Sequence, residues 1–384
     1  MECKRCGNTD PEYFYKGHKG WYCRKCVGFR RILLEEEPQG PDYEVSEEVS
    51  EYRFGFPLTK YQKEISRKCL EYIKDSDVLL HCVCGAGKTE IVVETISRYL
   101  ERGLKVCYAI ARREVVKELY VRFSSLFPYA RTVAVYGGHH DEITGDLIVC
   151  TTHQLFRYYR TFDLLILDEV DAFPLSGNTE LMNIALNSAG GNIIFSTATV
   201  NGFLEGVLKK RKVRELKLYI RPSLRPLTVP KLFHAPAVIL YPLLFILLKR
   251  MKRQCIIFVS AKKECYRLYL VFRLFFSCTY VYADAKDRDR NIREFKDRKH
   301  RFIFATTVLE RGITIKGVNV IVLDLHRNIF SEENIVQMLG RVGRDVNDPY
   351  GDAYILYRYK DTAVSRAVAF IKEANEISKM SLLR

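Results

Sequence analysis

The fold of this chain is decided by residues 79–89, which read LLHCVCGAGKT. An apolar run ends there in a glycine-bearing turn, the turn ends in Lys88 and Thr89, and apolar residues then recur at helical spacing. This layout is that of a P-loop, in which backbone N–H groups and a helix N-terminus surround a phosphate. It predicts that Lys88 contacts the β- and γ-phosphates of a nucleotide and that Thr89 binds Mg²⁺. The first glycine of the G-x-x-x-x-G-K-[ST] pattern falls at Cys82, so a purely structural turn stays open as an alternative.

The composition describes a basic chain that can form more than one domain. Its 384 residues, 48% of them hydrophobic, are enough for two or three cores. The formal net charge of +15 and the 12% of aromatic residues predict a polyanionic partner, usually nucleic acid. A generally basic surface is the alternative interpretation.

The apolar segments and the cysteines favour a cytoplasmic protein. Residues 1–6 are polar, and no apolar run of a secretory signal follows them. The longest apolar run, residues 237–248, contains Pro242 and is too short to span a bilayer, so we expect a buried helix and no transmembrane segment. Eight of the twelve cysteines are scattered singly or in apolar runs, which favours free thiols in a reducing compartment.

The other four cysteines predict a metal site. They form two C-x-x-C pairs with sixteen residues between them, Cys3 with Cys6 and Cys23 with Cys26. This spacing is typical of a zinc ribbon, in which four thiolates enclose a structural Zn²⁺. A redox-active pair of dithiols is the less favoured alternative. Residues 1–34 are too few to fold on apolar burial alone, so metal binding would supply the missing stability.

Aromatic and basic residues are interleaved around these cysteines. The set comprises Tyr13, Phe14, Tyr15, Lys16, Lys19, Trp21, Tyr22, Arg24 and Lys25. Such a mixture suits base stacking beside phosphate contacts. It equally suits a small core for the module itself, and the sequence leaves both interpretations open.

Beyond the cysteines, an acidic segment leads into an α/β pattern. Residues 35–53 contain two prolines and a glycine and predict a solvated linker. From residue 54 to residue 220, apolar strands alternate with helical periodicity, with strands expected at 78–83, 106–110, 132–135, 147–150, 164–167 and 192–195. This alternation predicts a parallel sheet whose ligand lies at the carboxyl ends of its strands.

Two of the predicted strands end in polar residues that suit nucleotide hydrolysis. Residues 168–171 read DEVD, and the pattern predicts that Asp168 binds Mg²⁺ and that Glu169 orients or deprotonates the attacking water. Residues 196–199 read STAT, and the hydroxyls of Ser196 and Thr199 can bond the acidic pair and sense the γ-phosphate. A simple helix N-cap is the alternative for these hydroxyls.

A second α/β pattern follows a basic, proline-rich connection at residues 221–236. Strands are expected at 255–259, 279–282, 302–305, 320–323 and 353–356, and no second P-loop is present in this part. Residues 337–344 read QMLGRVGR, and the paired Arg341 and Arg344 suit arginine fingers that stabilise charge on a transferring phosphoryl group. A basic surface turn is the alternative.

In their order, these motifs resemble those of superfamily 2 helicases and translocases, which have two RecA-like domains. The resemblance covers residues 54–384, and GAGKT, DEVD, STAT and QMLGRVGR are its most specific parts. The four-cysteine module and residues 162–174, FDLLILDEVDAFP, narrow it to the ComFA family of late competence proteins from Gram-positive bacteria. It implies a zinc-binding module (1–34), an acidic linker (35–53), a RecA-like domain (54–220), a connection (221–236) and a second RecA-like domain (237–384).

The resemblance also implies roles for single residues. It assigns adenine contact to Gln62, water activation to Glu169 and γ-phosphate contact to Arg341 and Arg344. It assigns coupling of hydrolysis to domain motion to Ser196 and Thr199, and contact with the nucleic-acid strand to Arg112, Thr151 and Thr306. The residues that it assigns to nucleotide and metal binding are Cys84, Gly85, Ala86, Gly87, Lys88, Thr89, Asp168, Gly312 and Gln337. Residues 111–113 read ARR and lack the proline often found in the motif that contains Arg112.

The function implied by the resemblance is ATP hydrolysis with Mg²⁺ that drives single-stranded DNA into the cell. It implies ComFC and DprA as candidate partners and a place at the inner face of the membrane, beside the DNA-uptake channel. The zinc module would grip the strand or dock a partner, and the oligomeric state stays open. Three alternatives remain: an RNA helicase with the same ATPase core, a duplex-unwinding DNA repair helicase, and a nucleic-acid-binding scaffold without ATPase activity. Intact Lys88, Glu169 and Arg344 argue against the scaffold.

Overall fold

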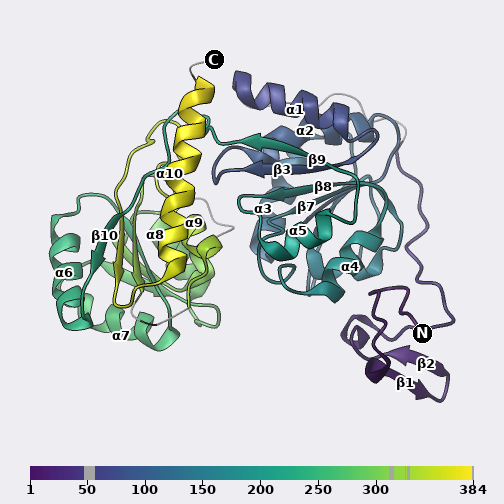
Figure 1. Ribbon diagram of the computed structural model, residues 1–384, viewed down its shortest axis with the longest axis horizontal. Coiled ribbons are helices and arrows are strands. Elements are labelled where there is room, and N and C mark those ends of the chain that lie inside the picture. The colour runs from purple at the N-terminus through teal and green to yellow at the C-terminus, as the bar shows by residue number, and fades with distance from the viewer. Residues whose placement is uncertain (47–56, 311–314, 325, 327–328, 383–384) are drawn as a thin grey trace. The chain divides into compact units, whose positions relative to one another are not determined.

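The structure is a computed structural model that describes residues 1–46, 57–310, 315–324, 326 and 329–382. Contacts between residues divide the chain into two compact units (Figure 1). The first unit comprises Met1–Cys82 and Lys88–Leu218, and the second comprises Val83–Gly87 and Tyr219–Arg384.

The first unit begins with a small module, residues 1–34, built on a two-stranded hairpin. Strands β1 (Phe14–Gly17) and β2 (Gly20–Cys23) pair antiparallel between the short 3₁₀ helices η1 (Pro11–Tyr13) and η2 (Val27–Phe29). Gly20, the first residue of β2, has a φ of 130°, which side chains rarely allow. Phe14 and the four clustered cysteines are the buried residues of its small core, which is completed by Ile184 from outside the module.

The main body of the first unit is a parallel sheet flanked by helices. Within the described residues, seven strands lie in the order β5-β6-β4-β7-β8-β3-β9. They are β3 (Asp77–Cys82), β4 (Val106–Ile110), β5 (Thr132–Val135), β6 (Leu147–Thr151), β7 (Phe162–Asp168), β8 (Ala189–Thr197) and β9 (Val213–Leu218). The helices are α1 (Lys60–Tyr72), α2 (Lys88–Leu100), α3 (Arg113–Leu126), η3 (Thr152–Arg157), α4 (Thr179–Ser188) and α5 (Gly202–Leu208). Every residue of β3, β4 and β6 is buried, which explains why these strands read as nearly continuous apolar runs.

Parallel pairing brings the carboxyl ends of these strands to one edge of the sheet. The register pairs Asp168 of β7 with Ser196 of β8, and it pairs Leu80 of β3 with the same serine. The next neighbour of β7 is β4, where Tyr108 lies opposite Ile166. The motifs that follow β3, β7 and β8 therefore share this edge.

The second unit contains another parallel sheet, with the order β10-β15-β14-β11-β13-β12 within the described residues. Its strands are β10 (Lys231–His234), β11 (Cys255–Val259), β12 (Cys278–Val281), β13 (Phe302–Ala305), β14 (Asn319–Asp324) and β15 (Ala353–Tyr357). The helices are α6 (Ala237–Arg250), α7 (Lys262–Phe272), α8 (Arg288–Lys296), η4 (Thr307–Leu309), α9 (Glu332–Leu339) and α10 (Thr362–Leu382). Two helix-flanked parallel sheets and a four-cysteine cluster confirm the predicted fold class.

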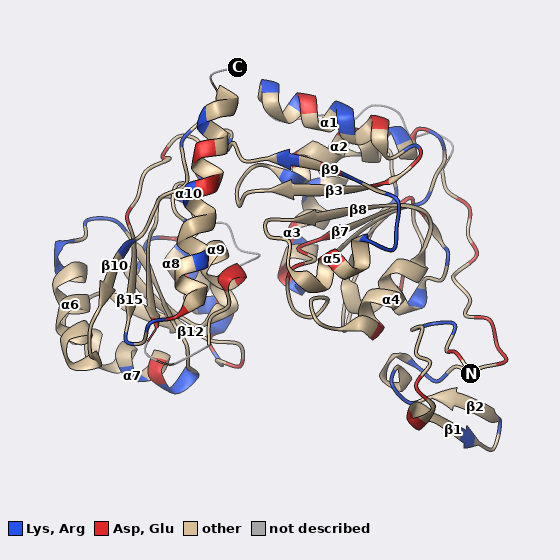
Figure 2. Ribbon diagram, in the orientation of Figure 1, with Lys and Arg blue, Asp and Glu red and all other residues tan. Residues whose placement is uncertain are grey.

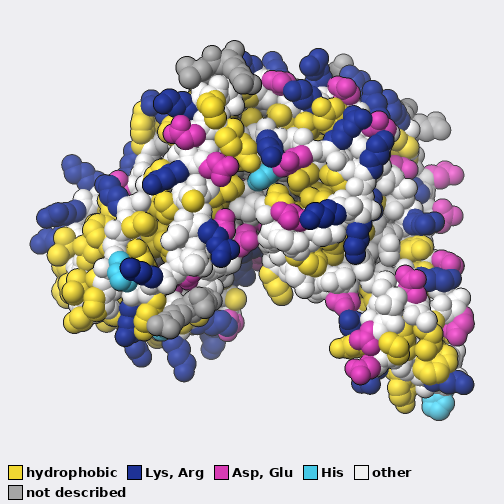
Figure 3. Space-filling view, viewed as in Figure 1, with side chains coloured by type: hydrophobic (Ala, Val, Ile, Leu, Met, Phe, Trp, Pro, Cys, Tyr) yellow, Lys and Arg dark blue, Asp and Glu magenta, His cyan; other side chains and the backbone are white. Residues whose placement is uncertain are grey.

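Helix α6 corrects one expectation. Its sequence is apolar nearly all round, yet its buried residues are limited to Leu240, Leu244 and Leu248, four positions apart on one stripe. Hydrophobic side chains accordingly gather on the surface over α6 (Figure 3). The expectation of a buried helix is thus wrong, because Val238, Ile239 and Ile246 on the opposite side of α6 are exposed. Among the described residues, none of the helices combines the length and the apolar character that spanning a bilayer requires.

Candidate nucleotide site and four-cysteine cluster

The turn between β3 and α2 has the backbone that its glycines were expected to permit. Gly85 and Gly87 have φ values of 82° and 85°, in the left-handed region that glycine adopts without strain. The amide of Ala86 donates to the carbonyl of Val83 at 3.1 Å and closes the turn. Cys84 and Ala86 are buried. Such a turn points backbone N–H groups toward one concavity, which suits phosphate.

Lys88 and Asp168 meet at the carboxyl edge of the first sheet. The Lys88 Nζ lies 3.9 Å from the Asp168 Oδ1, and both side chains are largely buried. Lys88 is the first residue of α2 and Asp168 is the last residue of β7, so the sheet and one helix fix their separation. A partly buried lysine beside a carboxylate is the pair that nucleotide phosphates and their cation require.

The Asp168 carboxylate is held by three donors. Ser196 Oγ donates to Oδ1 at 2.7 Å, and the Glu169 amide donates to the same oxygen at 2.9 Å. The hydroxyl of Tyr108 donates to Oδ2 at 2.8 Å. Burial and the nearby Asp168 raise the pKa of Tyr108 well above its usual value, so the hydroxyl keeps the proton that it donates.

Tyr108 was missed by sequence reasoning. It lies on β4, sixty residues before Asp168, and looked like one more apolar strand residue. Its hydroxyl is also 3.5 Å from Thr89 Oγ1, so it lies between the hydroxyl and the carboxylate expected to hold Mg²⁺. Hydroxyl and carboxylate oxygens are the ligands that this hard cation prefers, so the residues fit the ion.

Glu169 has an unusual backbone. Its φ of 56° places a residue with a side chain in the left-handed region. Its carbonyl accepts from the Ala172 amide at 2.9 Å, which closes a tight turn directly after β7. Strain of this kind is concentrated at functional sites, where the surrounding structure over-determines it. Here the turn changes the direction of the chain between Asp168 and Asp171.

The STAT motif contacts the DEVD motif through two side-chain hydrogen bonds. Ser196 donates to Asp168, as described, and Thr199 Oγ1 donates to Asp171 Oδ2 at 2.8 Å. Thr197 Oγ1 donates to the Thr199 carbonyl at 2.6 Å and shapes the turn between them. Two separate hydroxyl–carboxylate bonds therefore join the ends of β7 and β8.

The other predicted residues of the first unit lie in simple local settings. Gln62 is buried, and its side-chain oxygen accepts from the Thr59 amide at 3.0 Å in a capping box at the start of α1. Arg112 is the half-buried N-cap residue of α3, and Thr151 is the buried last residue of β6. A capping role accounts for the Gln62 oxygen without a nucleotide.

In the second unit, the predicted arginines belong to the turn after α9. Arg341 is buried, and its Nε donates to the Glu310 carbonyl at 3.1 Å. Arg344 is half-buried, and its Nε donates to the Gly340 carbonyl at 2.9 Å. Gln337 is a buried residue of α9, and Thr306 is the N-cap residue of η4. The predicted Gly312 lies outside the described residues.

Arg221 organises that turn and was also missed by sequence reasoning. It lies in the proline-rich connection but is buried, and its NH1 and NH2 atoms donate to the carbonyls of Val342 (2.6 Å) and Gly340 (3.0 Å). NH1 also lies 3.3 Å from the Gly343 carbonyl. Burial and the nearby charge of Arg344 lower the pKa of Arg221 to about 10, so it remains charged at neutral pH. The planar fork of its guanidinium suits several carbonyls at once.

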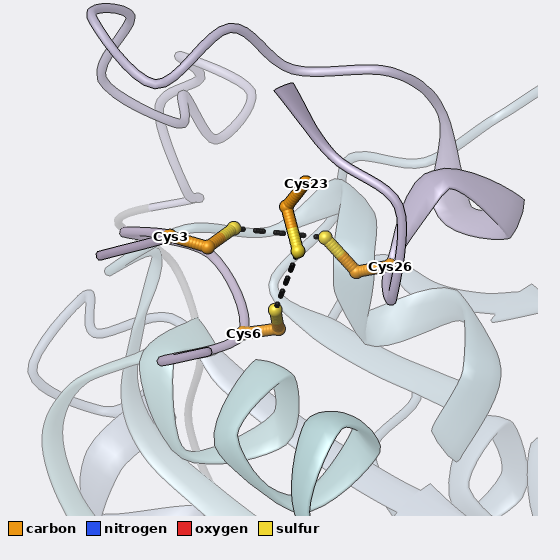
Figure 4. Close-up of side chains that lie close together, drawn as sticks. All are labelled: Cys3, Cys6, Cys23 and Cys26. Atoms are coloured by element: carbon orange, nitrogen blue, oxygen red, sulfur yellow. Dashed lines mark hydrogen bonds between the residues drawn. The ribbon is translucent and has the colours of Figure 1, made fainter. Parts of the chain in front are cut away.

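The four N-terminal cysteines converge on one point (Figure 4). Their sulfurs all lie within 4.8 Å of one another, with 3.6 Å between Cys3 and Cys26 and 3.8 Å between Cys6 and Cys23. A tetrahedral Zn²⁺ with Zn–S bonds of about 2.3 Å places its sulfurs about 3.8 Å apart. The donor set therefore fits zinc. Arg5 lies against the cluster, and its NH2 is 3.2 Å from the Cys26 sulfur.

The module is docked on α4 of the same unit. Asn183 Nδ2 donates to the Cys6 carbonyl at 2.9 Å, and Asn187 Nδ2 donates to the Arg5 carbonyl at 3.1 Å. Lys25 forms an ion pair with Glu180 at 3.0 Å. Helix α4 begins eight residues after Asp171. A short segment of chain therefore connects the DEVD motif to the helix on which the module is docked.

Comparison with known proteins places this chain among nucleic-acid motors. Residues 55–201 match the family described as type III restriction enzyme, res subunit, and residues 238–346 match the helicase conserved C-terminal domain. Dbp5 of S. cerevisiae bound to RNA and ADP BeF3 superposes with a TM-score of 0.62 at 17% identity, over 84% of this chain and 96% of that chain. Mycobacterium smegmatis helicase Lhr bound to ssDNA and AMP-PNP gives a TM-score of 0.61 at 15% identity, over 84% of this chain and 48% of that chain. At these identities the likeness establishes the fold alone.

Full-length relatives are more informative. Competence protein ComFA of Bacillus subtilis is 30% identical over 405 residues, which cover 98% of this chain and 86% of that protein. Competence protein ComFA of Streptococcus pneumoniae is 29% identical over 390 residues, which cover 97% of this chain and 90% of that protein. With the res-subunit family and the helicase C-terminal domain both matched, the chain is an ATP-hydrolysing helicase or translocase that acts with Mg²⁺. It belongs to the ComFA family of competence proteins.

Proposed function

We propose that this chain is an ATP-driven motor that moves single-stranded DNA during bacterial transformation. The observation that carries the proposal is the position of Asp168. Tyr108 and Ser196 donate hydrogen bonds to its carboxylate, and its Oδ1 lies 3.9 Å from the Nζ of Lys88. A lysine, an oriented carboxylate and a hydroxyl at one sheet edge meet the needs of phosphoryl transfer. The net charge of +15 and membership of the ComFA family support DNA as the polyanion and uptake as the process.

In the proposed reaction, Lys88 neutralises charge on the β- and γ-phosphates. Thr89 and Asp168 hold Mg²⁺, which supplies further positive charge to the phosphate oxygens when bound. Glu169 orients a water molecule and accepts its proton as the water oxygen attacks the γ-phosphorus and the bond to the bridging oxygen of ADP breaks. Gln62 contacts adenine, and the P-loop backbone, with Gly312 and Gln337, completes the nucleotide contacts.

We propose that hydrolysis is coupled to movement through the second RecA-like domain. Arg341 and Arg344 contact the γ-phosphate when the two domains close, and release of phosphate removes that contact. Ser196 and Thr199 pass the change at Asp168 and Asp171 to the rest of the first domain. The strand is held by its backbone, with Arg112, Thr151 and Thr306 as candidate contacts, so binding is independent of sequence and sensitive to salt.

The N-terminal cysteines are proposed to bind a structural Zn²⁺ with no vacant coordination position. The place of work is proposed to be the inner face of the cell membrane beside the DNA-uptake channel, with ComFC and DprA as candidate partners. These points are supported by family membership and by the donor set of the cluster.

The test is steady-state ATP hydrolysis without nucleic acid and with single-stranded DNA, duplex DNA or single-stranded RNA. We expect strong stimulation by single-stranded DNA that is lost in Lys88→Ala and Glu169→Gln. An RNA helicase remains the second candidate, because relatives at 24–25% identity include ATP-dependent RNA helicases. Equal or greater stimulation by RNA would favour that candidate, since the 2′-OH distinguishes the two strands. Absence of hydrolysis with every nucleic acid would contradict the motor.

A further inference from the structure

The hairpin of the N-terminal module carries two tyrosines side by side on its outer face. Tyr15 on β1 lies directly opposite Tyr22 on β2, and the rings meet edge to face with centroids 5.7 Å apart. The neighbouring pair in the register, Phe14 and Cys23, is buried in the cysteine cluster. Successive side chains of a strand point to opposite faces, so Tyr15 and Tyr22 point away from that cluster. Tyr15 is 52% exposed. The hairpin thus divides its aromatic residues between a core face and an outer face.

An arginine lies over each of these rings. The Arg24 Cζ is 6.0 Å from the centroid of Tyr15, and the Arg31 Cζ is 4.4 Å from the centroid of Tyr22. Both arginines are exposed. The attraction between a guanidinium and the face of an aromatic ring holds each cation beside a stacking surface. We call these four residues the tyrosine face.

The charge of the module complements an anion. Residues 1–34 contain eight lysines or arginines and three acidic residues, which are blue and red in Figure 2. Two of the lysines are engaged by carboxylates from outside that segment, Lys4 by Glu37 and Lys25 by Glu180. Within the described part of the chain, the module's other exposed basic side chains have no carboxylate partner, namely Lys16, Lys19, Arg24, Arg30 and Arg31. The face therefore presents aromatic rings among uncompensated positive charges.

We propose that the tyrosine face binds single-stranded nucleic acid, with a base stacked on Tyr15 and the neighbouring phosphates contacted by Arg24 and Arg31. Bases of a single strand expose the π-faces that such stacking needs, whereas those of a duplex are covered by their neighbours. Every base has a π-face, so the contact is independent of sequence. The proposal rests on the proposed function, and it adds a grip on the strand outside the two RecA-like domains.

The experiment measures binding of the full chain to a labelled oligothymidylate of about 15 nucleotides, near the upper end of common site sizes, by fluorescence anisotropy. Replacing both tyrosines, Tyr15→Ala with Tyr22→Ala, is expected to weaken binding by about ten-fold or more, because each stacked base contributes substantially. Tyr15→Phe with Tyr22→Phe keeps the rings and should bind like the unmodified chain. Tyr129→Ala is the matched control, since Tyr129 is also exposed but lies outside the module, just before β5 of the first large sheet.

Two measurements establish that the variants are folded. Bound zinc is quantified, and fluorescence of Trp21, the single tryptophan of the chain, reports on β2. An alanine variant that retains zinc and binds the strand as tightly as the unmodified chain overturns the proposal. Should Tyr22→Ala disturb the module, Tyr15→Ala alone decides, because the Tyr15 ring lies outside the buried cluster.

Binding of the unmodified chain to an abasic strand, a chain of deoxyribose phosphates without bases, tests whether base stacking contributes to affinity. The abasic strand keeps the charges and lacks the bases, so we expect its affinity to match that of the double alanine variant for thymidylate. Equal affinity of the unmodified chain for the abasic and the thymidylate strand overturns the base contact. Absence of DNA-stimulated ATP hydrolysis contradicts the proposed function instead, so the two failures are distinguishable.

Discussion

The Lys88–Asp168 pair of the nucleotide site and the four-cysteine cluster both belong to the first unit but are stabilised in different ways. Strands β3 and β4, which lead to the nucleotide site, are buried at every residue. The polar groups of the site are positioned by hydrogen bonds such as those from Tyr108 and Ser196 to Asp168. The cluster has Phe14 and four cysteines as its own buried hydrophobic residues and takes Ile184 from α4. A large apolar core can orient charged groups, whereas a module with so few buried residues needs further support, which we propose comes from zinc and from α4.

Removal of the proposed zinc should have the largest effect, and it should act on the module and not on the first large sheet. Chelation, or Cys23→Ser, is expected to unfold residues 1–34 while the first sheet stays folded, because structural zinc supplies on the order of 10 kcal/mol in small modules. Limited proteolysis with mass spectrometry will locate the cleavages. Cys278→Ser, a buried cysteine of β12, is the control and should retain the metal. A module that resists protease without metal would contradict its dependence on the ligand.

Arg221 extends the comparison to the second unit. Arg221→Lys keeps the charge but loses the fork that bonds Val342 and Gly340, so the turn carrying Arg341 and Arg344 is released. We expect kcat for ATP to fall between about 10- and 100-fold and KM to rise as well, because Arg221 Nε also donates to the carbonyl of Cys84 in the P-loop at 2.9 Å. The control is Arg225→Lys, whose side chain is exposed. A rise in KM at constant kcat would rule out this positioning role.

Tyr108→Phe tests whether hydrogen bonds orient the nucleotide site. Loss of the donor to Asp168 should lower kcat by about ten-fold and raise the Mg²⁺ concentration needed for half-maximal activity. Tyr158→Phe is matched to it, since Tyr158 is buried and donates to the Ile143 carbonyl away from the site. If both variants have the same kcat and Mg²⁺ requirement, the Tyr108 hydroxyl does not orient Asp168 for catalysis.

The smallest effect is expected at the contact between the module and α4. Gly7 has a φ of 67°, and a Cβ there would approach Asn183 Nδ2 to 2.8 Å, so Gly7→Ala costs about 1–2 kcal/mol and disturbs the bond to Cys6. We expect faster proteolysis of the segment after the module, with metal retained. Gly28→Ala meets open space and serves as control. Equal cleavage rates in the two variants would mean that docking through Asn183 is unimportant.

Sequence patterns predicted the fold class because each pattern is local. A strand, a glycine turn and Lys88 are adjacent in the chain, as are a strand and Asp168, and two C-x-x-C pairs indicate one cluster. Tyr108 and Arg221 escaped because their partners are distant in sequence: β4 pairs with β7 only in the folded sheet, and the turn after α9 lies more than a hundred residues from Arg221.

The hairpin could be predicted from the sequence only in part. Alternation along β1 and β2 could have separated Phe14 from Tyr15 and Tyr22, had the register of the strands been known. The docking of the module on α4 could not have been predicted, because Asn183 and Asn187 bind backbone carbonyls, which carry no sequence signal.

The most direct test of the account is single-turnover ATP hydrolysis by the unmodified chain and by Glu169→Gln with saturating single-stranded DNA. Glu169 follows the strand that ends in Asp168 and is proposed to accept the proton of the attacking water. The account predicts that the variant binds ATP as tightly as the unmodified chain and hydrolyses it at least about a hundred-fold more slowly. Hydrolysis by Glu169→Gln at the unmodified rate would contradict the assignment of catalysis to this edge of the sheet.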